Sequence, residues 1–268
     1  MTTPSTTASG FDADGIRLIS PADASFGHWV DDLAEPGWAQ FIKDAVPSVV
    51  VLVNESDRTI VAMSTVFEVN GGVRASRNSV FFVAPDAIAS SELDYGRASE
   101  ESIAPGEGRM IGFNFRVPDR TDAGKFTQEE RDFYDPQTRN WIQSTAAELV
   151  TARAVHVSLD TVIFADGLLL GDDASRLVSH FDTLVQEKQR VYRFLVNRLD
   201  AGEPAGAVIE AFMRQSEPEL DRLDSESYAA NEARNTVDHL LRNYGPEALR
   251  DVLNRALLPQ PFVIVRRS

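Results

Sequence analysis

The run DASRLVSHFDTLVQEKQRVYRFLVNRL, residues 173–199, decides how this chain is organised. Apolar residues recur in it every three or four positions, which is the period of one helix face. The stripe consists of Leu177, Phe181, Leu184, Val191 and Leu195. Asp172 and Asp173 stand before it, where carboxylates cap helices, and Gly202 follows, where glycine favours a stop. The run predicts one amphipathic helix of roughly 40 Å at 1.5 Å per residue, between a β-rich first part and a helical last part.

The apolar stripe has two interpretations. Leu177, Leu184 and Val191 are seven residues apart, as in a coiled coil, so the stripe is a candidate surface for self-association. Lys188 and Arg198 interrupt that register, and a coiled coil needs three to four clean heptads. The pattern therefore favours a helix that lies on its own domain, and leaves pairing with a second chain open.

Composition limits the classes of partner. The chain has 268 residues, 43% of them hydrophobic and 25% charged, which suits a soluble protein with a core. Its net charge of −15 opposes binding to nucleic acids and anionic membranes. Without cysteine it holds no disulfide, thiolate nucleophile or cysteine-bound zinc. We expect no cofactor, no nucleic-acid partner and no membrane partner.

The expected compartment is the bacterial cytoplasm. The first residues lack the basic and apolar regions of a secretory signal, and no run approaches the roughly 18 apolar residues that span a bilayer. The basic residues are almost all arginine, which fits a GC-rich bacterial genome. A mature exported chain remains an alternative.

The first part of the chain predicts strands joined by turns. Residues 1–14 are small and polar and predict a disordered tail, and the aromatic-rich residues 26–46 predict a short helical insertion. Strands are expected at 16–19, 49–53, 59–69, 79–83, 111–117, 154–164 and 168–170. Asn70-Gly71-Gly72 and Asp166-Gly167 are hairpin-turn signals.

One strand changes the parity of its apolar residues. Val155, Val157 and Leu159 share a face, whereas Val162 and Phe164 continue on the opposite parity. A β-bulge near Asp160-Thr161, or burial of both faces at that end, accounts for the change.

Three stretches carry a family resemblance. NESDRTIVA at residues 54–62, the turn Pro105-Gly106 and VIFADG at residues 162–167 together look like bacterial immunoglobulin-like sandwich domains of unassigned function. The resemblance covers residues 48–170, lacks the cysteine pair of true immunoglobulin domains and implies a fold without an activity. The expected fold class is α+β: an antiparallel immunoglobulin-like β-sandwich followed by a small α-helical domain that the long amphipathic helix leads.

The expected domain boundaries follow the same patterns. They are a tail at 1–14, the sandwich with its helical insertion at 15–170, the helical domain at 171–258 and a strand-like tail at 259–268. Residues 120–139 are charged and predict a long loop, and residues 141–152 fit helix or strand. The final strand-like piece returns either to the sheet or to the edge of a partner.

No catalytic or metal motif has its required spacing. The four histidines, His28, His156, His180 and His239, lack the spacing of a zinc motif. His156, Ser158 and Asp160 share a strand face, but steps of about 6 to 7 Å are too long for a Ser–His–Asp relay. We interpret this row as a solvated sheet face.

Weaker patterns favour structural roles. Asp12-Ala13-Asp14-Gly15 resembles the start of a calcium loop, but the bidentate glutamate at the twelfth position is missing and Asp23 stands there. The acidic pairs at 100–101, 129–130 and 172–173 predict solvated loops or caps. Trp29 and Trp38 favour packing on a sheet over a sugar-binding platform.

The favoured hypothesis is a binding or assembly module that acts through protein–protein contacts, including self-association. One alternative is a hydrolase, carbohydrate-directed, with a carboxylate pair in a cleft that the tryptophans line. Another is a calcium-stabilised structural module.

Overall fold

The structure is a computed structural model that describes residues 5–35, 37–44, 49–80, 102–113, 117–120 and 128–214, with short pieces at 237, 245, 249–251, 253–254, 257 and 264–266. The chain forms two compact units. We call the first, Met1–Ser79 with Ser102–Ser175 and Val265–Ser268, the sheet unit. We call the second, Val80–Glu101 with Arg176–Ile264, the helical unit.

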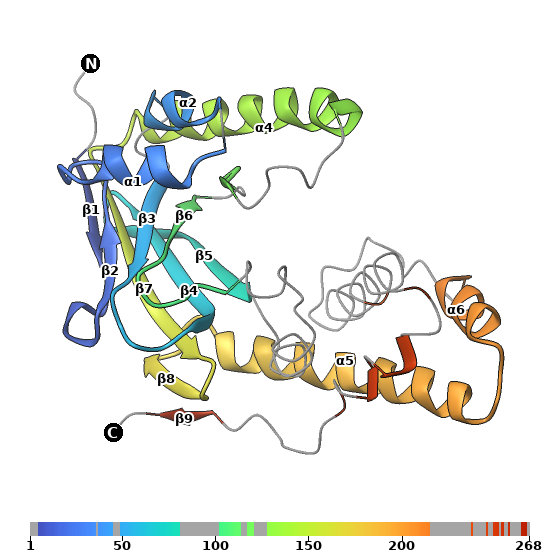
Figure 1. Cartoon of the computed structure of the whole chain (residues 1–268). Helices are drawn as coiled ribbons and strands as arrows, with labels where there is room; N and C mark the ends of the chain where they lie inside the picture. Colours follow the sequence, from blue (N-terminus) through green and yellow to red (C-terminus); the bar gives the residue numbers. More distant parts are fainter. Residues whose placement is uncertain are drawn as a thin grey trace. The chain divides into compact units, whose positions relative to one another are not determined.

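The larger sheet of the sheet unit has six strands and is mixed (Figure 1). Its two long central strands, β4 (Ile60–Val69) and β7 (Ala154–Phe164), run antiparallel. Beside them lie β5 (Gly72–Val80) next to β4, and β1 (Ser5–Ser9) and β8 (Leu168–Gly171) next to β7. β1 pairs in parallel with β7, and β9 (Val265–Arg266) pairs in parallel with β8. Strand β7 is therefore the centre of the sheet, because β4 pairs along one side of it while β1 and β8 pair with successive parts of its other side.

The smaller sheet has three antiparallel strands, β2 (Ile16–Ile19), β3 (Val49–Asn54) and β6 (Gly108–Gly112). All six residues of the central strand β3 are buried, which explains its continuous run of valine and leucine. The helices α1 (Phe26–Leu33) and α2 (Ala39–Asp44) contribute to the same apolar cluster as this sheet.

The predicted fold class is wrong. The molecule is mixed α/β, with parallel and antiparallel pairs in one sheet and several helices beside the sheets, and is not an antiparallel sandwich with one long helix. The parallel pairs come from the two ends of the chain. Alternation in a sequence predicts that a segment is a strand, but it does not say which strand is its neighbour.

The predicted disordered tail is wrong from residue 5 onward. Residues 5–9 form β1, and Asp12–Asp14 form a short 3₁₀ helix, η1. Thr6 is only 5% exposed. The segment is too polar to predict a core strand, and its order comes from backbone pairing with β7, which the sequence pattern of residues 1–14 does not contain.

The local turn and bulge predictions are confirmed. Asn70 and Gly71 both adopt positive φ, as a tight turn between β4 and β5 requires, and Gly167 does so between β7 and β8. The β4–β7 register passes from Ser64↔Thr161 to Thr65↔Leu159, so Asp160 is the extra residue of a bulge. Thr161 and the three residues after it are also all buried, so both explanations of the parity change hold.

The predicted loop at 120–139 is wrong over its second half. Helix α4 (Gln128–Leu149) occupies it and continues through the segment that fitted helix or strand. Ile142, Thr145 and Leu149 form its buried face at helical spacing. Pro136 and the polar residues around it concealed the helix from a hydrophobic pattern.

Helix α5 (Leu177–Asp200) begins later than predicted. Asp173 and Arg176 have a left-handed backbone, and Arg176 takes the N-cap position without a side-chain cap bond, so the predicted aspartate cap is wrong. The predicted stop is confirmed, because Gly202 has a φ of 84° and donates its N–H to the carbonyl of Leu199.

The stripe of α5 is buried within the chain, so the interaction surface predicted there is corrected. Exposure is at most 5% for each of Leu177, Phe181, Leu184, Val191 and Leu195. Val191 and Leu195 belong to a core cluster of the helical unit that also includes Val208 of α6 (Ala205–Arg214). A continuous apolar stripe predicts burial, but it does not distinguish a partner chain from the same chain.

The final strand-like piece returns to the sheet, as β9. The predicted strand at 79–83 and the helices predicted between 216 and 258 lie mostly outside the described residues.

Candidate functional site

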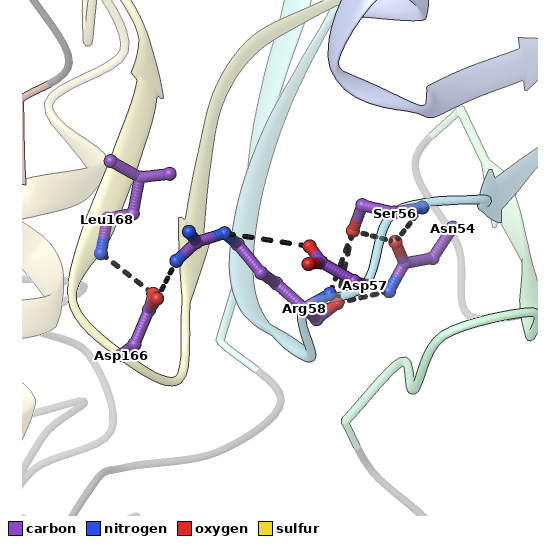
Figure 2. A network of polar contacts seen from close by, with 6 residues as sticks. All are labelled: Asn54, Ser56, Asp57, Arg58, Asp166 and Leu168. Atoms are coloured by element: carbon purple, nitrogen blue, oxygen red, sulfur yellow. Dashed lines mark hydrogen bonds and ion pairs between the residues drawn. The ribbon is translucent and has the colours of Figure 1, made fainter.

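Asn54 is the centre of a polar network at the end of β3 (Figure 2). Its side-chain Nδ2 donates to the carbonyl oxygens of Arg58 at 2.7 Å and Ile103 at 2.9 Å. Its Oδ1 accepts from the backbone N and the hydroxyl of Ser56, at 3.2 and 2.6 Å. Its main chain bonds to Gly106 and Glu107. Since the residue has no exposed surface, the amide binds its own chain and no ligand.

Arg58 extends this network to a second turn. Its guanidinium forms an ion pair with Asp166 and lies 3.8 Å from the carboxylate of Asp57 (Figure 2). Asp166 also accepts the backbone N–H of Leu168 at 3.2 Å. The three stretches that carried the family resemblance, at 54–62, 105–106 and 162–167, thus meet here, and their polar residues hold turns together.

His156 is the centre of a second, exposed cluster. Thr7 Oγ1 lies 2.9 Å from its Nδ1, and Ser9 Oγ lies 3.2 Å from its Nε2. The parallel register places Thr7 directly beside His156 and Ser9 beside Ser158. On the other side, Glu68 of β4 stands opposite His156. The sequence pattern did not single out Thr7 and Ser9; the one strand signal here is the alternation of these two hydroxyl residues with Thr6 and Ala8.

The predicted row of His156, Ser158 and Asp160 is not a catalytic group. Asp160 lies in the bulge, and its carboxylate accepts the backbone N–H groups of Ala174 and Ser175 at 3.2 and 2.8 Å. It fixes the segment that precedes α5. The face is accessible at the His156 end and closed at the other, where Ser64 and Thr161 have no exposed surface.

The tryptophans pack on the smaller sheet. Trp38 is 2% exposed and belongs to the cluster of α1, α2 and β3, and Trp29 packs against that cluster. The Arg139 guanidinium lies 4.3 Å from the Trp38 ring centre and 4.8 Å from that of Phe41. Burial of Trp38 is the observation that counts against a sugar-binding platform.

Two carboxylates of the described residues have structural partners that lower their pKa. The hydroxyl and backbone N–H of Ser25 donate to Asp23 and lower its pKa, and Arg198 lowers the pKa of Glu203. The general acid of a glycoside hydrolase needs a raised pKa. Within the described ranges, no three histidine, aspartate or glutamate side chains could together hold a metal ion.

Helix α4 carries an exposed aromatic residue. Trp141 is 59% exposed, whereas its neighbour Ile142 is fully buried. Between residues 136 and 147 the exposed side chains of α4 are all uncharged. They are Pro136, Gln137, Asn140, Trp141, Gln143, Ser144 and Ala147. Because the sequence predicted a loop up to residue 139, it did not predict this exposed helix face.

Comparison of the chain with protein-family models, with curated proteins and with solved structures found no match. The immunoglobulin-like resemblance therefore stays a prediction. No helix in the part of the chain that the structure describes combines the length and apolar character that crossing a membrane requires. The expected cytoplasmic location and the absence of a nucleic-acid partner also stay predictions.

Proposed function

We propose that the protein is an assembly module that pairs with a second copy of itself through the exposed residues of α4 between 136 and 147, which we call the outer face of α4. The observation that supports this proposal is the uncharged exposed face around Trp141. It replaces the surface first expected on α5, whose apolar residues are buried in their own chain.

Charge restricts where a second copy could bind. The chain has a net charge of −15, so two copies repel each other over most orientations. Interface centres are depleted of charged residues and enriched in aromatic ones. The outer face of α4 lets two acidic copies meet without opposing like charges, and Glu148 follows it as a boundary.

The expected dimer is weak. Residues 136–147 extend over roughly 18 Å of helix, which gives a contact at the small end of protein interfaces. We therefore expect reversible association that depends on protein concentration. Trp141 would contribute most of the binding energy, because tryptophan is enriched among interface hot spots.

Sedimentation equilibrium over a range of protein concentrations tests the proposal. The mass of the unaltered chain should rise from monomer toward dimer, and Trp141→Glu should keep it at monomer. Phe194→Glu is the matched control, since Phe194 is another exposed aromatic residue, 39% exposed, on α5. A monomer at every concentration, or equal association of Trp141→Glu and the unaltered chain, would contradict the proposal.

A further inference from the structure

We propose that Ser9 and His156 form a nucleophilic site for acyl transfer on the accessible face of the larger sheet. The site uses β1 and β7 and is independent of the outer face of α4. It would act on small activated carboxylic esters.

The strand geometry brings the reacting groups together. Side chains two residues apart on a strand share a face, so Thr7 and Ser9 both project beside His156. The Ser9 hydroxyl lies 3.2 Å from Nε2, which is within hydrogen-bond reach of a general base. Thr7 and Ser9 are exposed, so an ester reaches the Ser9 hydroxyl from solvent.

Thr7 is a positioning residue. When Nε2 accepts the Ser9 proton, Nδ1 must carry the ring hydrogen, and Thr7 Oγ1 at 2.9 Å accepts it. This bond selects the tautomer that leaves the Nε2 lone pair toward Ser9, a role that a carboxylate has in a Ser–His–Asp triad. Glu68, opposite His156 on β4, adds negative charge near the imidazolium that forms.

The proposed reaction has two balanced steps. Ser9 Oγ attacks the carbonyl carbon of the ester while its proton moves to His156 Nε2. The bond from that carbon to the alcohol oxygen breaks, and the alcohol leaves with the proton from Nε2. Water then attacks the acyl-serine with His156 as base, which releases the carboxylic acid and restores the Ser9 hydroxyl.

The experiment uses the full chain and 4-nitrophenyl acetate, with release of nitrophenol and peptide mass spectrometry as readouts. We expect acetylation at Ser9 that Ser9→Ala removes. His156→Gln should slow it about 100-fold, the scale of general-base catalysis. Acetylation of Ser9 no faster than that of the exposed Ser144, or a rate unchanged in His156→Gln, would overturn the proposal.

Matched variants separate catalysis from folding. Ser158→Ala removes the residue beside Ser9 in the strand register and should leave the rate unchanged. Thr7→Val, which keeps the side-chain shape without the hydroxyl, should slow acetylation about tenfold, and Thr7→Ser should restore the rate. An equal rate in Thr7→Val and Thr7→Ser would contradict the positioning role. In the Trp141→Glu variant, Ser9 should be acetylated at the rate of the unaltered chain. The acyl-transfer proposal and the self-association proposal can therefore fail independently.

Discussion

Asn54 is a buried polar residue whose loss should destabilise the sheet unit. Replacing it with alanine removes one of two donors from each of the carbonyl oxygens of Arg58 and Ile103, which keep the Ser56 hydroxyl and the Ile60 N–H. Because each lost hydrogen bond costs about 0.5–1.5 kcal/mol, we expect Asn54→Ala to lower the free energy of unfolding by about 2 kcal/mol. Denaturant titration followed by tryptophan fluorescence measures this change.

The neighbouring residue Ser56 supplies the control for Asn54. Its hydroxyl donates to Asn54 Oδ1 from a half-exposed position, so Ser56→Ala should cost about 1 kcal/mol. Asn54→Asp keeps the size and the acceptor but loses the two donor hydrogens, and should resemble Asn54→Ala. If Asn54→Asp has the stability of the unaltered chain, the amide donors do not hold these turns.

His180 should make the stability of the helical unit depend on pH. Burial lowers its pKa below the ordinary value of 6.5, because desolvation disfavours the charged ring. The unfolded chain then binds more protons than the folded chain between the lowered pKa and 6.5. Stability should therefore fall as pH decreases through this window, and level off below the folded-state pKa.

His180→Gln should flatten that pH dependence, measured as the urea midpoint of the helical circular-dichroism signal at several pH values. Ser179→Ala, an exposed neighbour on the same helix, should keep the slope of the unaltered chain. An unchanged slope in His180→Gln would assign the pH dependence to other groups.

At the scale of the element, adjacent residues of α5 differ sharply in burial. Leu195 has no exposed surface and packs in the cluster of the helical unit, whereas Phe194 is 39% exposed. Leu195→Ala should lower the free energy of unfolding by about 3 kcal/mol, as for other buried leucines. Phe194→Ala should cost less than about 1 kcal/mol. The reverse order, measured by urea titration of the helical signal, would mean that the stripe packs elsewhere.

Elements were predictable where their cause is local. The Asn70-Gly71 turn, the Asp166-Gly167 hairpin and the bulge at Asp160 all follow from residues within a few positions of each other. β1 and α4 were not predictable in this way. β1 depends on a partner more than 140 residues away, and α4 has polar residues over its first half. The contact between Ser9 and His156 was not predictable either, because only the long-range pairing of β1 with β7 brings the two residues together.

At the scale of the whole molecule, the two units are interleaved in the sequence. The chain enters the helical unit after residue 79 and again after residue 175, and returns to the sheet unit at residues 102 and 265. The sequence marks the later change at 170–171, where strands give way to the long helix, and contains no matching signal at residue 79. A contiguous fragment therefore does not correspond to either unit.

The two units should unfold in separate transitions, because the core cluster around α1 and α2 shares no residue with the cluster of α5 and α6. All three tryptophans, Trp29, Trp38 and Trp141, belong to the sheet unit, so tryptophan fluorescence reports on that unit alone. Leu195→Ala should leave the fluorescence midpoint in place, while the part of the circular-dichroism signal that comes from α5 and α6 is lost at lower urea. Ile42→Ala, in the fully buried core of the sheet unit, should lower the fluorescence midpoint at a cost of about 3 kcal/mol. A fluorescence midpoint lowered equally by both variants would show that the two cores unfold as one cooperative system.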